Sequence, residues 1–453
     1  MIELNATHDP QATSWLSSAQ RPGTDFPIQN LPFAVFQHMS GTEPFRGGVA
    51  IGDQVIDLAL LAQAGVLDGL AQDAARACSL PVLNNFMGMG PAAWRALRQA
   101  LFDLLKTGAE GPAVEALRLC LVPQIAVRYQ LPAHVRDYTD FYTSIHHAAN
   151  IGKLFRGDDN VLTPNFQWMP IAYHGRSSSL GVSGQTFPRP MGQYLPPGAS
   201  QPVYGPCQRM DYELELGFFV GPGNAQGSPI PLAEAESHVF GVCLLNDWSA
   251  RDIQGWEYQP LGPFLGKNFA TTISPWVVTL EALAPFRQAW DRPSDHPQPL
   301  PYLEGADHRA HGALDIQLQV AIESAAHRAG GHAPAPVSHT SFRHQYWTMA
   351  QMVTHHTMGG CNLQPGDLLG SGTISGPTLP EAGAMIELTR AGREPLTLRS
   401  PGAADESRGF LQDGDTVVLR GWCEKPGFAR IGFGEARGTV LPAREGGASG
   451  ALG

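Results

Sequence analysis

The stretch DYELELGFFV at residues 211–220 alternates acidic and apolar side chains at its start. This period of two is typical of a β-strand, in which successive side chains point to opposite faces. Glu213 and Glu215 therefore share one face of the predicted strand. Two like charges this close repel each other unless a positive group lies between them. The hard cations Ca²⁺ and Mg²⁺, which bind several oxygen ligands, would fit, but a solvated outer face of an antiparallel strand is an equally open alternative.

Composition places the chain among globular proteins rich in sheets and loops. It has 453 residues, of which 43% are hydrophobic and 16% charged, with 51 glycines and 38 prolines. This length allows two or three domains, and so many turn-forming residues favour β-sheets joined by loops. The net charge of −11 argues against a protein that binds nucleic acid.

Signals for membrane insertion or secretion are not apparent. No apolar run reaches the roughly 18 residues of a membrane span, and residues 1–13 have no apolar signal core. The six cysteines lie far apart without a Cys-x-x-Cys pair, so reduced core residues are expected instead of a disulfide framework. We therefore expect a soluble cytoplasmic protein that binds neither nucleic acid nor membranes.

The N-terminal region, residues 1–125, is expected to form a small β domain with helical additions around its own core. Short strands are predicted at 33–37 and within 48–58, where the Gly52-Asp53 dipeptide is typical of a hairpin turn. An amphipathic helix is predicted over 91–107, because Pro91 suits a first helical turn and Gly108 a C-terminal stop.

The remaining chain is expected to form a larger β domain at 126–443 and a flexible tail at 444–453. Buried strands are predicted at 239–246 and 276–280, and a helix over 343–356. The Asp413-Gly414 dipeptide predicts a hairpin between 409–411 and 416–422. Residues rich in proline, glycine or alanine predict an irregular loop at 181–207 and connections at 285–301 and 325–336, the last mobile and on the surface.

Two further segments, residues 137–147 and 246–258, concentrate side chains that can take part in chemistry. Asp247 follows an apolar run and so stands where catalytic groups are often mounted, although it could equally cap a following helical turn. His147 could act as a general base near neutral pH. An incidental pair of neighbouring histidines, His146 and His147, is the more common explanation of such a pattern.

Other common catalytic patterns are missing. No zinc-binding spacing of histidines or cysteines is present, and His355 and His356 would point to different faces of a helix and favour a packing role. The GTISG sequence at 372–376 misplaces its serine for a nucleophile elbow, and no phosphate-binding loop follows the glycines at 221–223. Serine hydrolase chemistry and nucleotide binding are therefore disfavoured.

Six segments together resemble the fumarylacetoacetate hydrolase family, in order and over nearly the whole chain. They are DYTDFY (137–142), YHGRSS (173–178), ELE (213–215), NDWSARD (246–252), PLGPFLGK (260–267) and SGTISG (371–376). Several of these motifs are long and rare. The N-terminal region also belongs to the resemblance, since smaller relatives with the same catalytic fold usually lack it.

The resemblance implies a mainly β fold, with an N-terminal SH3-like barrel domain and a C-terminal mixed β-sandwich roll that carries the active site and dimerises. It implies metal-dependent hydrolysis of the carbon–carbon bond of 4-fumarylacetoacetate to fumarate and acetoacetate, the last step of tyrosine and phenylalanine breakdown. The implied cofactor is Mg²⁺ or Ca²⁺, and the implied assembly is a cytoplasmic homodimer.

The resemblance also implies roles for individual residues. The metal ligands fall on Asp140, Glu213, Glu215 and Asp247, and a second cation site falls on Asp247, Lys267 and Thr271. The general base falls on His147, oriented by Glu387, and the oxyanion donors fall on Arg251, Gln254 and Lys267. Substrate contacts fall on Tyr142, Arg156, Tyr173, Gln254, Tyr258 and Thr373. One departure is Ala270, beside the second cation site, where relatives commonly have glycine.

The implied chemistry explains why these residue types are needed. His147 would take a proton from the water that attacks the carbonyl beside the fumaryl group, and the oxyanion donors would hold the resulting charge. An acylpyruvate hydrolase or oxaloacetate decarboxylase on the same fold is the alternative, and could dispense with the pair His147 and Glu387. A catalytically inactive binding protein is a third possibility, against which the intact residue set argues.

Overall fold

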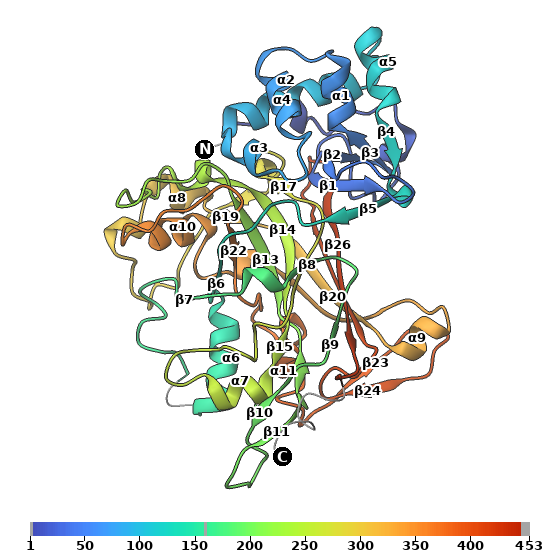
Figure 1. Cartoon of the computed structure of the whole chain (residues 1–453). Coiled ribbons are helices and arrows are strands. Elements are labelled where there is room, and N and C mark those ends of the chain that lie inside the picture. The colour runs from blue at the N-terminus through green and yellow to red at the C-terminus, as the bar shows by residue number, and fades with distance from the viewer. Residues whose placement is uncertain (1–2, 158–160, 445–453) are drawn as a thin grey trace, which may run out of the picture.

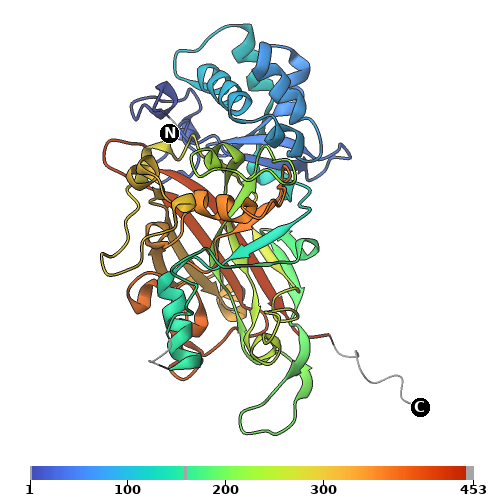
Figure 2. The same cartoon turned by 90° about the vertical axis from the view of Figure 1, so that its left-hand side faces the viewer.

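The computed structural model describes residues 3–157 and 161–444. A smaller N-terminal part rich in helices sits on one end of a larger part built from β-sheets, as two perpendicular views show (Figure 1, Figure 2). No helix within these two ranges is long and apolar enough to cross a membrane. The flexible tail expected at 444–453 lies outside the described residues, apart from its first residue.

A curled, five-stranded antiparallel sheet forms the base of the N-terminal part, in the order β4-β3-β2-β1-β5 (Figure 1). Its strands are β1 (Phe33–His38), β2 (Arg46–Ile51), β3 (Gln54–Asp57), β4 (Leu121–Pro123) and β5 (Val127–Gln130). The predicted turn is confirmed, because Ile51 pairs with Gln54 and Gly52 has a φ of 55°. Glycine adopts this left-handed conformation without a steric penalty.

Five helices cover one side of this sheet (Figure 1). They are α1 (Leu58–Ala64), α2 (Gly69–Ala77), α3 (Asn84–Gly88), α4 (Pro91–Leu105) and α5 (Pro112–Leu119). The helix predicted over 91–107 is α4, which begins at Pro91 and buries Leu97 and Leu101 on its apolar face. It ends two residues earlier than predicted, because Lys106 already has extended backbone angles.

The N-terminal part shares its core with the larger part. The ring of Phe240, in strand β14 (Val239–Asp247), packs edge-on against Phe86 and Trp94 at centroid distances of 5.4 and 5.2 Å. Phe33 also pairs with Val277 through a β-bridge. The expected separate core is therefore wrong, because β14 is buried along its whole length and one of its apolar faces is covered by the N-terminal helices.

A central eight-stranded sheet runs through the larger part, in the order β7-β6-β22-β13-β14-β16-β8, with β17 also paired to β14. Besides β14, its strands are β6 (Tyr138–Phe141), β7 (Ala172–His174), β8 (Leu180–Val182), β13 (Leu214–Val220), β16 (Thr271–Ile273), β17 (Val278–Thr279) and β22 (Leu368–Gly370). The pairs β6–β22 and β8–β16 are parallel and the others are antiparallel, so the sheet is mixed. The strands predicted at 239–246 and 276–280 are β14 and β17.

A second sheet packs against the first in the order β21-β20-β25-β26-β9. Its strands are β9 (Gln185–Pro188), β20 (Gln317–Glu323), β21 (Ala335–Ser341), β25 (Thr416–Cys423) and β26 (Ile431–Leu441). Leu244 of β14 and Leu419 of β25 belong to one buried apolar cluster between the sheets. The predicted mainly β fold, an N-terminal SH3-like barrel domain with a C-terminal mixed β-sandwich roll, is confirmed as a curled half-barrel sheet in the N-terminal part and packed mixed sheets in the larger part.

Shorter elements surround these sheets. The helices are α6 (Ile145–Arg156), α7 (Arg251–Glu257), α8 (Ala306–His311), α9 (Ala325–Ala329), α10 (Met349–Thr357) and α11 (Met385–Leu388). The two-stranded ribbons are β10 (Met191–Tyr194) with β11 (Val203–Pro206), β12 (Met210–Asp211) with β15 (Ser249–Ala250), β18 (Arg287–Gln288) with β19 (Ala313–Leu314), and β23 (Leu396–Leu398) with β24 (Glu406–Arg408). Helices α6 and α7 lie near the end of the larger part that is farther from the N-terminal helices (Figure 1).

Two segments predicted to be irregular are ordered. Residues 181–207 contain β8, β9, β10 and β11, and the first two join the edges of the large sheets in parallel. Edge positions tolerate the prolines that suggested a loop. Residues 325–336 contain α9 and the start of β21, because Ser324 caps the helix by accepting a hydrogen bond from the backbone of His327.

Two other predictions fail at their boundaries. The helix expected over 343–356 begins only at Met349, since Thr348 and Gln351 form a capping box there. The turn at Asp413-Gly414 is present, but the segment at 409–411 is no strand. Its neighbour β24 pairs with β23 instead of β25.

Candidate active site

Four buried carboxylates from neighbouring strands meet in the central sheet and form what we call the carboxylate cluster. One oxygen from each of Asp140, Glu213, Glu215 and Asp247 lies within 4.8 Å of the others. Their strands are neighbours, because β6 pairs with β22, β22 with β13, and β13 with β14. The cluster therefore joins side chains from three distant segments, and its first and last members, Asp140 and Asp247, are more than a hundred residues apart in the chain.

The two glutamates of the 211–220 stretch share a face, as predicted. Glu213 is 5% exposed and Glu215 is fully buried, and both point into the carboxylate cluster. The solvated-face alternative is therefore wrong. Tyr212, Leu214 and Leu216 point the other way, into the apolar core.

Gly370 leaves the space that the cluster occupies. A Cβ atom at this position would lie 2.8 Å from Oδ1 of Asp140 and 3.0 Å from Oε2 of Glu215. Only glycine is compatible with carboxylates this close to the backbone. Two residues later, the backbone amide of Gly372 donates a hydrogen bond of 3.0 Å to the same Oε2 of Glu215.

The cluster carries more negative charge than its surroundings balance. Burial and the nearby Asp247 raise the pKa of Asp140 well above its usual range, and burial and Asp140 do the same for Glu215. One oxygen of each, Oδ1 of Asp140 and Oε1 of Glu215, has no hydrogen-bond partner among the described residues. Buried oxygens without donors are what a hard divalent cation requires, so the residues present fit such an ion.

Lys267 balances part of this charge. Its Nζ lies 2.7 Å from Oδ2 of Asp247 and also contacts Glu213. Burial lowers the pKa of a lysine, but here the two carboxylates outweigh it and raise the pKa, so the ammonium persists. Thr271 and Tyr173 also donate hydrogen bonds of 3.0 Å to Asp247.

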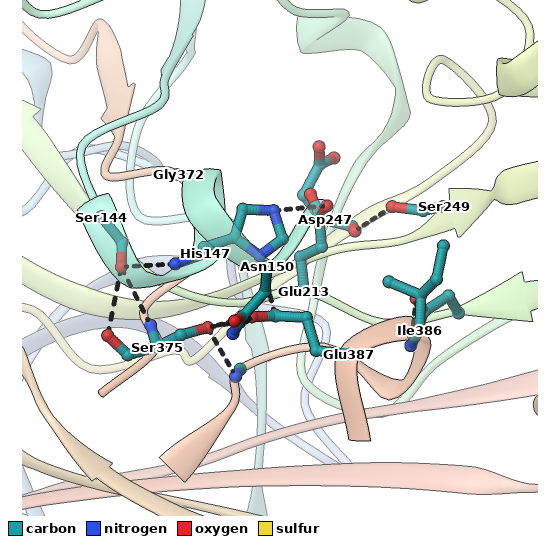
Figure 3. A network of polar contacts seen from close by, with 12 residues as sticks. Ser144, His147, Asn150, Glu213, Asp247, Ser249, Gly372, Ser375, Ile386 and Glu387 are labelled. Carbon is teal, nitrogen blue, oxygen red and sulfur yellow. Dashed lines mark hydrogen bonds and ion pairs between the residues drawn. The ribbon is translucent and has the colours of Figure 1, made fainter. Parts of the chain in front are cut away.

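A buried histidine and glutamate lie beside the cluster (Figure 3). Nδ1 of His147 is 2.7 Å from Oε2 of Glu387, and its Nε2 faces Glu213 at 3.9 Å. Burial raises the pKa of Glu387, but His147, Asn150 and Ser375 together lower it below its usual range. The glutamate therefore remains charged and holds the imidazole with Nδ1 protonated, which leaves the lone pair on Nε2 free.

His147 is fixed through its helix as well. Ser144 caps α6 by accepting a hydrogen bond from the backbone of His147. The hydroxyl of Ser375 donates to both oxygens of Glu387, at 3.0 Å each, and the amide of Asn150 donates to its Oε1 at 2.8 Å. Each partner of the pair is thus held from at least one further side (Figure 3).

Arg251 reaches Glu213 of the cluster from the start of α7. Its Nη1 lies 2.8 Å from Oε1 of Glu213 and 3.3 Å from the side-chain oxygen of Gln254. The second amino group, Nη2, is buried and has no partner among the described residues. Together with Lys267, Arg251 lowers the pKa of Glu213, although burial alone would raise it.

Comparison with known proteins identifies the family. Residues 137–441 match the family described as "Fumarylacetoacetate (FAA) hydrolase C-terminal", and residues 29–132 match "Fumarylacetoacetase N-terminal". The chain belongs to the fumarylacetoacetase family. It is 48% identical to the fumarylacetoacetase of Bos taurus, over 93% of this chain and 97% of that protein, and 47% identical to that of Homo sapiens over the same shares. The fumarylacetoacetase of Oryza sativa is 45% identical over 93% and 96%.

A solved structure agrees on the fold. The fumarylacetoacetate hydrolase of Exiguobacterium antarcticum superposes with a TM-score of 0.50 at 16% identity, over 91% of this chain and 100% of that one. The curated relatives and the family match make this chain an enzyme, a hydrolase of the fumarylacetoacetase family that acts on a small molecule.

The structure brings only some of the expected substrate-binding residues of this fumarylacetoacetase-family chain close to the cluster. Tyr142 packs edge-on against His147 at a centroid distance of 5.4 Å, and Tyr173 bonds to Asp247. Thr373 is buried just after Gly372. Their roles toward a substrate stay predictions.

Two expected substrate contacts lie at the C-terminal ends of helices α6 and α7. Arg156 ends α6, and its Nη2 donates a hydrogen bond of 2.8 Å to the backbone of Val161. Tyr258 follows α7, is 47% exposed, and accepts a hydrogen bond from its neighbour Gln259. Their roles in substrate binding stay predictions.

Sequence reasoning missed the residues that hold the site in shape. Asn150 and Ser375 orient Glu387, and Asp211 binds Arg251. Asp211 carries a local signal, because it continues the alternation of Glu213 and Glu215 by two residues. Ser375 lies inside the SGTISG motif, but that motif does not indicate its contact with Glu387, and nothing in the local sequence marks Asn150, whose partner is distant in the chain.

Proposed function

We propose that this chain hydrolyses the carbon–carbon bond of 4-fumarylacetoacetate to give fumarate and acetoacetate, as in tyrosine and phenylalanine breakdown. The observation that supports this most is the buried pair of His147 and Glu387 beside the carboxylate cluster. A general base next to an oxygen-rich cation site is what hydrolysis of a β-diketone needs. The names of the relatives point to the same substrate.

The cation would be held by Asp140, Glu213, Glu215 and Asp247, whose oxygen donors suit Mg²⁺ or Ca²⁺. When bound, it would supply Lewis-acid stabilisation of the negative charge that develops on the diketone. A further cation near Lys267 and Thr271 is part of the same proposal. The ammonium of Lys267 has no lone pair, so its Nζ serves there as a charge partner of Asp247.

The proton is handled by His147 in this proposal. Its free Nε2 takes a proton from water while Glu387 stabilises the imidazolium that forms. The water oxygen bonds to the carbonyl carbon beside the fumaryl group, the carbon–carbon bond then breaks, and the proton passes to the acetoacetate carbon. The buried, unpartnered Nη2 of Arg251, with Gln254 and Lys267, would hold the negative oxygen of the tetrahedral stage.

Positioning of the substrate falls to residues around this centre. Tyr142 packs against His147, Tyr173 bonds to Asp247, Thr373 is buried, and Arg156 and Tyr258 stand at the ends of α6 and α7. We propose that the charged and hydroxyl groups among them hold the carboxylates of the substrate, since charge-assisted hydrogen bonds are strong and directional.

We also propose the assembly and setting that the family resemblance implied. Residues 1–125 and 126–443 would act as an N-terminal and a catalytic domain, and two chains would form a cytoplasmic homodimer. Size-exclusion chromatography with light scattering tests the dimer, for which the mass should be twice the 48.6 kDa of one chain.

The alternative function is an acylpyruvate hydrolase or oxaloacetate decarboxylase on the same fold. A decarboxylase has no need to activate water, so the pair of His147 and Glu387 favours hydrolysis. A direct test follows the ultraviolet absorbance of the diketone with fumarylacetoacetate, and separately with an acylpyruvate, with and without chelator. Turnover of the acylpyruvate alone would overturn the proposal.

The variant His147→Ala tests the mechanism. We expect at least a 100-fold loss of turnover because the general base is gone, while metal content stays unchanged because His147 lies outside the ligand set. His146→Ala is the matched control, since the neighbouring ring points at His344 with a centroid distance of 6.0 Å. Near-normal turnover in His147→Ala would remove this residue from the mechanism.

A further inference from the structure

We propose that Asp211 is a positioning residue that holds Arg251 and helix α11 in register, so that both halves of the catalytic apparatus depend on one buried carboxylate. The inference deepens the proposed function and rests on it. Asp211 lies outside the carboxylate cluster, whose ligands are the four acids described above. It acts through other residues and touches no reacting atom.

Three of the four hydrogen bonds to the Asp211 carboxylate come from helix α11 and Arg251. Oδ1 accepts from the backbone amides of Tyr212 and Met385, both at 2.8 Å. Oδ2 accepts from the backbone amide of Ile386 at 3.0 Å and from Nε of Arg251 at 2.8 Å. The side chain is fully buried, so water does not compete for these bonds.

The bond to Arg251 decides where its guanidinium points. With Nε held by Asp211, Nη1 reaches Glu213 and Gln254, and Nη2 is left buried without a partner. A guanidinium is planar, so fixing one edge fixes the directions of all its donors. Asp211 thereby sets the direction of the donor that the proposed mechanism assigns to the oxyanion.

The bonds to Met385 and Ile386 fix the element that carries Glu387. Helix α11 has only four residues, and a single helical turn is unstable without outside partners. Its N-cap residue, Ala384, provides no side-chain cap. The carboxylate of Asp211 takes over this role from a distant strand and binds the first two amides of the turn, one residue before Glu387.

The backbone around Asp211 is anchored to the same two elements. Asp211 pairs with Ser249 in the ribbon β12–β15, directly before α7 begins at Arg251. Glu213 forms a β-bridge with Ala384, directly before α11. The short segment 211–215 that supplies the cluster glutamates therefore also lines up the oxyanion donor and the partner of the general base.

The test is Asp211→Asn in the full-length enzyme, compared with Asp57→Asn. Asp57 is a close match, since it is fully buried, accepts from Arg46, and accepts from the first amides of α1 at Ala59 and Leu60, but in the N-terminal part. In Asp211→Asn the side-chain NH₂ of the asparagine would face N–H donors where a carboxylate oxygen now accepts, so hydrogen bonds would be lost. We expect kcat to fall about 100-fold, as misplacement of catalytic groups by about 1 Å does, with KM within about threefold and metal content unchanged.

The same substitution made in a second variant, Glu387→Gln, distinguishes a positioning role of Asp211 from a general loss of protein stability. If Asp211 acts through Glu387 and Arg251, then Asp211→Asn should cost far less than 100-fold when introduced into Glu387→Gln, since residues acting as a unit are not additive. Asp211→Glu keeps the charge and the acceptors, and we expect it to recover part of the lost kcat if Asp211→Asn proves poorly folded.

Three outcomes would overturn the inference. The first is a kcat for Asp211→Asn no lower than that of Asp57→Asn. The second is a full 100-fold loss that persists in the Glu387→Gln background. The third is a folded Asp211→Glu with no more activity than Asp211→Asn. If the wild-type enzyme turns over neither fumarylacetoacetate nor an acylpyruvate, the proposed function and this inference both fail. The three outcomes above leave wild-type turnover intact, so they overturn this inference alone.

Discussion

The N-terminal sheet and the central sheet bury acidic side chains in opposite ways. In the N-terminal sheet, Asp57 is surrounded by donors: Arg46 binds one oxygen at 2.7 and 2.8 Å, and two amides of α1 bind the other. In the carboxylate cluster, Asp140 and Glu215 each keep a buried oxygen without a partner. Both groups are equally buried, so burial does not explain the difference.

The comparison shows which of the two regions has a structural role and which a functional one. A buried acid with matched donors stabilises the local fold by itself, whereas buried like charges without donors destabilise it until a cation arrives. Such strain is found where proteins bind or react. Asp211 shares features of both regions. Its carboxylate oxygens have hydrogen-bond donors, as those of Asp57 do, but it lies beside the carboxylate cluster.

The largest expected effect comes from Glu215→Gln, which removes one cluster charge while keeping the side-chain shape. We expect kcat/KM to fall about 1,000-fold, or about 4 kcal/mol, because a ligand of the cation is lost. The metal-free variant should nevertheless be more stable than the metal-free wild type by about 1 kcal/mol, because fewer unpaired charges are buried. The diketone assay and urea unfolding in chelator measure the two effects.

Opposite signs for activity and stability are the essential part of this prediction. A variant that loses both would show that the cluster is a structural network of the same kind as Asp57. Asp57→Asn is the control for each measurement.

The next largest effect is on stability alone. We expect Asp57→Asn to lower the free energy of unfolding by about 3 kcal/mol, because it leaves the buried Arg46 without its charged partner. Its kcat/KM should stay within about twofold of wild type, since α1 and β3 carry no residue of the site. Urea unfolding midpoints and steady-state kinetics test this. A large loss of activity would contradict the assignment of a purely structural role to Asp57.

The smallest effect is the stabilisation by metal. At about 100 times its dissociation constant, Mg²⁺ or Ca²⁺ should stabilise the chelator-treated protein by about 2.7 kcal/mol. Thermal unfolding at increasing metal concentration measures the shift. We expect the shift to persist in Asp57→Asn and to vanish in Asp140→Asn. A shift of equal size in Asp140→Asn would place the ion elsewhere.

Local patterns predicted those parts of the fold that depend on neighbouring residues. The hairpin at Gly52, the helix α4 and the shared face of Glu213 and Glu215 follow from turn chemistry and side-chain period. Strands β8 and β9, which depend on longer-range contacts, were missed. Their pairing partners lie in β16 and β26, far along the chain.

The sequence by itself determined that two glutamates share one strand face and that its motifs resemble one enzyme family. Only the tertiary structure decided that this face is buried, and that Asp140 and Asp247 join it through strands paired across the sheet. The physical reason is the range of the forces involved. Side-chain period is a property of a few consecutive residues, whereas the charge balance around Asp140, Glu215 and Asp211 depends on which distant strands and donors the packed core brings together.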